Sequence, residues 1–213
     1  MFVKQFSMGG DRNFGYLAAC DGTKKAAVID PSYTPKKVYD FAQEKGFGIE
    51  YIFITHGHYD HTSGIEKLET LVSRKGLLYG STDPVTGTGI MDNTKLPLGD
   101  LSIQIIHTPG HTGDSMCILV GDALFTGDTL FVGKVGGTGF GVDAKDEYDS
   151  FHDKLLKLPD NIRVFPGHDY GTAVESTIGN EKKTNPFLLC KDLPSFIDLK
   201  KNWLEYKSKH GIK

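Results

Sequence analysis

The most constraining feature of the sequence is a dense group of metal-ligating residue types at one position in the chain. Residues 55–61 read Thr-His-Gly-His-Tyr-Asp-His, which places three imidazoles and a carboxylate within six positions. A short apolar run at residues 51–55 comes before the group, and apolar residues at helical spacing follow it at residues 65–72. The pattern predicts a strand that delivers polar side chains to its end, followed by a helix.

The types and spacing of these side chains indicate metal binding. In extended backbone, His56 and His58 project to the same side, whereas Asp60 and His61 come at the turn into the helix and face a second point. Zinc, iron and manganese all accept imidazole nitrogen and carboxylate oxygen as ligands. A lone histidine is usually a surface residue or a helix cap, but a dense cluster between a strand and a helix is typical of a metal centre.

The rest of the chain alternates between strand and helix patterns. Strands are predicted at residues 2–6, 14–20, 26–29, 101–107, 115–120, 123–126 and 162–165. Helices are predicted around Val38 and Ala42, around Phe151 and Leu155, and over residues 195–209 near the end of the chain. Two weakly patterned segments, 77–98 and 131–142, are expected to be loops beside the site. The order predicts mixed sheets covered by helices.

Composition limits the remaining classes of protein. With 213 residues, 38% of them hydrophobic and 24% charged, the chain is expected to form one domain over residues 1–213. A formal net charge of −3 argues against a nucleic-acid partner. No apolar run approaches the length of a membrane span or a leader, so we expect a cytoplasmic protein with a small-molecule substrate. Its oligomeric state is open. Three widely spaced cysteines do not predict a disulfide framework.

Several motifs together resemble those of one enzyme superfamily. The run His-Gly-His-Tyr-Asp-His is similar to the HxHxDH signature of the metallo-β-lactamase superfamily. Three later residues follow in the family's order: His111 in Thr-Pro-Gly-His-Thr, Asp128 in Thr-Gly-Asp-Thr-Leu, and His168 in Pro-Gly-His-Asp-Tyr. The resemblance extends to about Pro186. It implies an α+β fold, a four-layer αβ/βα sandwich of two mixed β-sheets with helices outside and a site at one sheet edge.

The resemblance also implies a set of metal ligands. One metal would bind His56, His58 and His111, and the other would bind Asp60, His61 and His168. Asp128 would bridge both. The two ions are expected to be divalent, with zinc favoured and iron or manganese as alternatives. A metal-bridging hydroxide would act as the nucleophile.

Further residues are assigned supporting roles. Asp60 or Asp128 is a candidate proton acceptor, and Tyr170 a candidate hydrogen-bond donor to substrate. Asp30 either orients a ligand histidine or begins a turn in Asp-Pro-Ser. His107 is expected to have a structural or supporting role rather than to bind a metal.

Within the superfamily, the motifs are most similar to the glyoxalase II-like group, which hydrolyses hydroxyacylglutathione thioesters. We therefore expect a hydrolase of thioesters or esters. In that group a basic and an aromatic residue after the Gly-Asp-Thr-Leu-Phe motif hold glutathione, whereas this chain has Gly137 and Gly139 in that segment. A preference for glutathione is therefore not expected, although Lys134 could meet a substrate carboxylate. The alternative is a persulfide dioxygenase with one iron on His56, His111 and Asp128.

Overall fold

The N-terminal half of the chain forms a five-stranded mixed sheet. In the computed structural model, which describes residues 1–211, the strands lie in the order β1-β2-β3-β4-β5. The first three are antiparallel neighbours, and β3, β4 and β5 run parallel. Their bounds are β1 (Phe2–Gly9), β2 (Asn13–Ala19), β3 (Lys25–Ile29), β4 (Gly48–Phe53) and β5 (Gly76–Leu77).

The C-terminal half contributes a six-stranded sheet in the order β13-β12-β9-β8-β7-β6. Only β9 and β12 run parallel in it, because the chain crosses over through helices between them. The bounds are β6 (Lys95–Leu98), β7 (Leu101–His107), β8 (Met116–Val120), β9 (Ala123–Gly127), β12 (Arg163–Pro166) and β13 (Ser176–Thr177). A small hairpin of β10 (Leu130–Phe131) and β11 (Lys134–Val135) follows β9.

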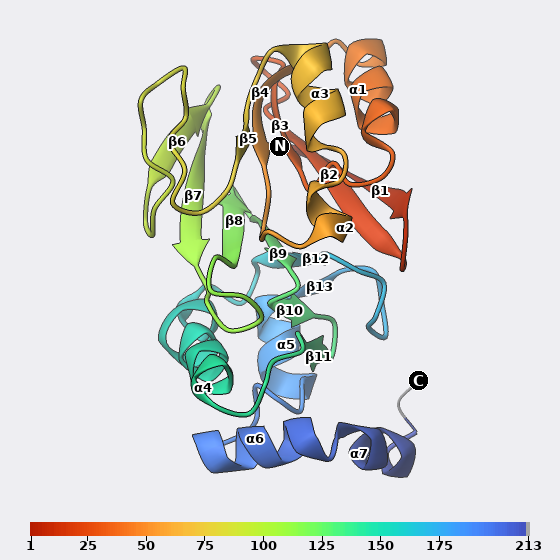
Figure 1. Ribbon diagram of the computed structural model, residues 1–213, viewed down its shortest axis with the longest axis vertical. Coiled ribbons are helices and arrows are strands. Elements are labelled where there is room, and N and C mark those ends of the chain that lie inside the picture. The colour runs from red at the N-terminus through yellow and green to blue at the C-terminus, as the bar shows by residue number, and fades with distance from the viewer. Residues whose placement is uncertain (212–213) are drawn as a thin grey trace.

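Helices cover the outer face of each sheet (Figure 1). The first sheet is covered by α1 (Pro35–Glu44) and α3 (Ile65–Val72), and the short α2 (Tyr59–Thr62) precedes α3. The second sheet is covered by α4 (Val142–Asp149) and α5 (Ile178–Thr184), with short η1 (Ser150–Lys154) and η2 (Leu155–Lys157). Helix α6 (Leu193–Lys201) packs on α4, and α7 (Trp203–Lys209) follows it. The predicted four-layer αβ/βα sandwich is confirmed.

The burial of β2 shows how the layers are built. All seven residues of β2 are buried, which requires cover on both faces of the sheet. Alternate side chains take alternate sides: Tyr16 and Ala18 join the apolar cluster between the sheets, while Leu17 and Ala19 join the cluster beneath α1 and α3. Tyr16 also donates a hydrogen bond from its hydroxyl to the carbonyl of Pro166, 2.5 Å away, which links the two sheets.

Three predictions from the sequence are corrected. The segment 131–142, expected to be a loop, begins in the hairpin of β10 and β11. The segment 77–98, expected to be a loop, ends in strand β6 at the edge of the second sheet. Pro97 lies in β6, and an edge strand tolerates proline because one side needs no amide donor. The helix predicted over residues 195–209 is divided at Asn202 into α6 and α7, which run nearly end to end at one end of the molecule (Figure 1).

The last two helices differ in how deeply they are buried. Phe196 anchors α6 in the core, whereas no residue of α7 is fully buried. None of the described helices combines the length and apolar character needed to cross a membrane.

Candidate metal centre

The seven predicted ligands come from four separate parts of the chain that meet at one edge of the two sheets. His56 and His58 lie between β4 and α2, and Asp60 and His61 are on α2. The other three come from the second half of the chain: His111 from the loop between β7 and β8, Asp128 from the end of β9, and His168 from the end of β12. Loops and strand ends therefore supply five of the seven residues, and α2 supplies the other two.

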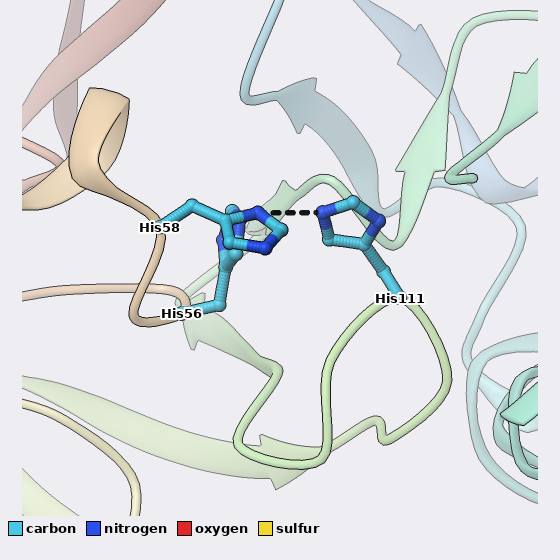
Figure 2. Close-up of side chains that lie close together, drawn as sticks. All are labelled: His56, His58 and His111. Carbon is cyan, nitrogen blue, oxygen red and sulfur yellow. Dashed lines mark hydrogen bonds between the residues drawn. The ribbon is translucent and has the colours of Figure 1, made fainter. Parts of the chain in front are cut away.

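The first group contains three histidines from two loops (Figure 2). Nδ1 of His58 lies 3.0 Å from Nε2 of His56 and 3.1 Å from Nε2 of His111. The imidazoles of His58 and His111 point toward each other across the gap between their loops (Figure 2). One potential ligand atom from each residue lies within 4.8 Å of the others, so a single ion can contact all three.

The second group contains a carboxylate and two histidines. Nε2 of His168 lies 3.1 Å from Nε2 of His61 and 3.1 Å from Oδ2 of Asp60. Asp128 lies between the two groups: its Oδ1 is 3.3 Å from Nε2 of His61, and its Oδ2 is 3.7 Å from Nε2 of His111. This carboxylate is therefore within reach of ions held by either group.

The surroundings of these atoms fit a divalent metal. Oδ1 of Asp128 is buried and has no hydrogen-bond partner among residues 1–211, although an unsatisfied buried carboxylate oxygen is costly. Burial and the neighbouring imidazole of His61 lower the pKa of His56 to about 2, which keeps it in the neutral form that binds metals. Burial opposes ionisation of Asp128, but the neighbouring imidazoles of His61 and His168 outweigh it and hold the pKa of Asp128 low.

Three of the predicted ligand histidines are oriented through a hydrogen bond at Nδ1. Nδ1 of His61 lies 2.9 Å from Oδ2 of the buried Asp30. The Asp30 carboxylate also accepts hydrogen bonds from the backbone amide and the hydroxyl of Thr55. Nδ1 of His111 donates to the carbonyl of Gly137 at 2.8 Å, and Nδ1 of His168 donates to the carbonyl of Asp11 at 2.8 Å. Such partners fix the tautomer and direction of a metal ligand. Of the two roles left open for Asp30, the structure shows the contact with a histidine of the predicted ligand set.

The charge on His61 reflects its two carboxylate neighbours. Burial lowers the pKa of His61, but the carboxylates of Asp30 and Asp128 outweigh burial and raise it to about 10. Metal-free His61 is therefore protonated at neutral pH, and a metal must displace that proton to bind there.

Asp11 in the β1–β2 turn and Asn13 at the start of β2 lie beside the site, although nothing in the sequence distinguishes them. Asn13 is fully buried, and its Nδ2 donates to Oδ2 of Asp60 at 2.9 Å. The start of β2 pairs with the segment after β12, since the amide of Phe14 donates a hydrogen bond to the carbonyl of Gly167 at 2.8 Å. In the sequence, Asp11 and Asn13 look like ordinary turn residues.

Tyr170 and His107 occupy different surroundings. The ring of Tyr170 stacks on His168 with centroids 4.4 Å apart, and its hydroxyl donates to Oδ2 of Asp11 at 2.6 Å. Burial and the Asp11 carboxylate raise the pKa of Tyr170. The ring of His107 stacks on that of Tyr79 with centroids 3.8 Å apart, and its Nε2 donates to the carbonyl of Gly113. Its structural or supporting role stays a prediction.

Comparison with known proteins gives a consistent set of relatives. Residues 9–73 and 69–168 match the model of the metallo-beta-lactamase superfamily. A probable hydroxyacylglutathione hydrolase, glo2 of Schizosaccharomyces pombe, is 32% identical over 88% of this chain and 86% of its own. A probable polyketide biosynthesis zinc-dependent hydrolase, BaeB of Bacillus velezensis, is 29% identical over 94% of this chain and 90% of its own. The crystal structure of ETHE1 from Myxococcus xanthus superposes with a TM-score of 0.85 at 30% identity, covering 95% of this chain and 91% of that one.

Proposed function

Since the chain belongs to the metallo-β-lactamase superfamily, we propose that it is a dinuclear metal-dependent hydrolase that cleaves a thioester or ester of a small molecule. The observation that carries the proposal is the second group of Asp60, His61 and His168, which lies beside the first with Asp128 between them. A site for one ion would not need this second group. The hydrolase names of the similar proteins support the same class of reaction.

The ligand assignment follows the two groups. We assign His56, His58 and His111 to one ion, Asp60, His61 and His168 to the other, and Asp128 to both. When bound, divalent ions of this kind lower the pKa of water to supply a nucleophile near neutral pH and polarise a carbonyl oxygen. Zinc is our first choice, with iron or manganese as alternatives.

The side chains around the ions have separate tasks. Partial burial opposes ionisation of Asp60, but the amide of Asn13 and the imidazoles of His61 and His168 lower its pKa. Asp60 and Asp128 are thus ionised at neutral pH, which is the state required of a proton acceptor. The Tyr170 hydroxyl can donate a hydrogen bond to substrate only if its present hydrogen bond to the Asp11 carboxylate breaks.

Lys134 is the proposed contact for a negative charge on the substrate. Its Nζ lies 5.4 Å from the centre of the Tyr170 ring, and it has no ion-pair partner among the described residues. Burial and the neighbouring Lys207 lower the pKa of Lys134, so an anion beside it would relieve an unfavourable environment. A substrate carboxylate fits this description.

We expect thioester hydrolysis with little preference for a glutathione leaving group. Gly137 and Gly139 provide no charged or aromatic contact, and each lost charge-assisted contact is worth about 1.5–3 kcal/mol. The test compares kcat/KM for S-lactoylglutathione with that for a short acyl thioester of another thiol, in protein of verified metal content. A thousandfold preference for glutathione would show that other residues recognise it. Absence of any thioester or ester hydrolysis would overturn the proposed reaction.

The persulfide dioxygenase is a second candidate, which the similarity to the ETHE1 structure keeps open. It would need one iron on His56, His111 and Asp128, and would leave Asp60 and His168 without a metal. Oxygen consumption with a persulfide substrate, measured beside the thioester reaction, separates the two candidates.

A further inference from the structure

A buried ion pair joins α4 to α6 outside the metal ligands. The ammonium of Lys200 on α6 contacts the carboxylate of Glu147 on α4, and the two side chains are only 6% and 0% exposed. Burying two charges is costly even when they pair, so such a pair is weak evidence for a role in stability alone. Its position relative to the metal centre suggests another role.

Lys200 makes a second contact that leads to a metal ligand. Its Nζ donates to the carbonyl of Gly136 at 2.8 Å. The next carbonyl, that of Gly137, accepts the hydrogen bond from Nδ1 of His111 at 2.8 Å. The loop also packs directly on this ligand, since a Cβ added to Gly136 would lie 3.2 Å from Cβ of His111. Lys200 therefore holds the peptide group of Gly136, and the next peptide group along the chain, that of Gly137, orients His111.

Glu147 supports His111 from another direction. A Cβ added to Gly110 would lie 2.3 Å from Cβ and 2.6 Å from Cα of Glu147, so α4 packs closely on the residue before His111. One turn along, the hydroxyl of Ser150 donates to the carbonyl of Pro109 at 2.8 Å. The two partners of the ion pair thus touch the two segments that determine where the His111 imidazole lies.

We propose that Lys200, paired with Glu147, is a positioning residue for His111, through which helix α6 sets the affinity of the metal site formed by His56, His58 and His111. This inference rests on the metal ligands assigned in the proposed function. The other group depends on different partners, since Asp30 and Asp11 orient His61 and His168. Loss of Lys200 should therefore weaken the site of His56, His58 and His111 more than the other site, which it reaches only through the packing of Gly136 on the Asp128 backbone.

The test is Lys200→Met in the full chain, with both zinc affinities measured by competition with a chromogenic chelator. Loss of an outer partner of a metal ligand typically costs about 10–100-fold in affinity. We expect one of the two zinc affinities to fall by about tenfold or more, and the other to stay within about twofold. Lys201→Met, an exposed position on the same helix, is the matched control and should leave both affinities unchanged.

A double-mutant comparison identifies which metal is affected. Lys200→Met should add nothing to the zinc affinity of a His111→Ala protein, because the residue that it positions is gone, but should retain its effect in a His61→Ala protein. An equal effect in both backgrounds, or equal weakening of both metals in the single variant, would overturn the proposal. The readout needs no substrate, so it stands even if no thioester is hydrolysed.

A second variant separates positioning from folding. Burial raises the pKa of Glu147 to about 7 although Lys200 opposes that shift, so Lys200→Met leaves an unpaired buried carboxyl that can unfold the chain. Lys200→Met combined with Glu147→Gln removes that carboxyl and is expected to recover most of the melting temperature. Its weaker zinc affinity should persist, because the carbonyl of Gly136 still lacks its donor. A double variant with both wild-type affinities would assign the pair to folding alone.

Discussion

Replacement of Asp128 by alanine is expected to abolish hydrolysis and to lower the occupancy of both metal sites. The carboxylate lies within 3.7 Å of ligand nitrogens from both groups, at His61 and at His111. Its removal takes a charged ligand from each ion, so we expect a loss of at least about a thousandfold in kcat/KM, more than the 10–100-fold cost of losing an outer partner. His61→Ala should mainly empty the second site.

The comparison of these two variants requires metal analysis as well as kinetics. Zinc per chain should fall toward zero in Asp128→Ala and toward one in His61→Ala, each measured after dialysis against the same chelator concentration. If both variants lost the same single metal, the assignment of Asp128 to both ions would be wrong.

Gly136→Ala is expected to reduce activity by about a hundredfold, because a misplacement of about 1 Å at a reacting centre can have that effect. A Cβ at this position would lie 2.0 Å from the backbone carbonyl oxygen of Asp128, which is far inside van der Waals contact. Backbone cannot move aside as a flexible side chain does, so either the Asp128 turn or the loop must shift.

The neighbouring glycine provides the control. A Cβ at Gly137 meets no atom within 4 Å among the described residues. Alanine at this position also keeps the backbone carbonyl that accepts the hydrogen bond from Nδ1 of His111. Gly137→Ala should therefore keep activity within about twofold, as surface substitutions usually change stability by less than 0.5 kcal/mol. Metal content and kcat/KM of both variants check the expectation. Equal activity of the two would show that the Asp128 turn tolerates displacement.

The sequence predicted the part of the site that is concentrated in short motifs. His56, His58, Asp60 and His61 occur within six positions, so strand and helix periodicity suffices to place them on one strand-to-helix junction. The association of this junction with the later motifs came from resemblance to a family, not from spacing. Mixed sheets covered by helices were predictable from the order of strand and helix patterns, whereas the four-layer arrangement came from the resemblance.

The supporting contacts could not be predicted because each joins distant parts of the chain. Asn13 and Asp60 are 47 positions apart, and Glu147 and Lys200 are 53 apart. None of these residue types is unusual for a turn or an exposed helix face, so only tertiary packing reveals the role. The division at Asn202 was missed for a related reason: the apolar spacing continues from α6 into α7 although the helix is interrupted.

The metal content of freshly purified, active protein distinguishes a dinuclear centre from a mononuclear one. Elemental analysis should find close to two divalent ions per chain, because both groups of ligands are complete and Asp128 lies between them. A reproducible single ion, retained with full activity while Asp60 and His168 remain without a metal in a crystal structure, would contradict the dinuclear account and favour the dioxygenase.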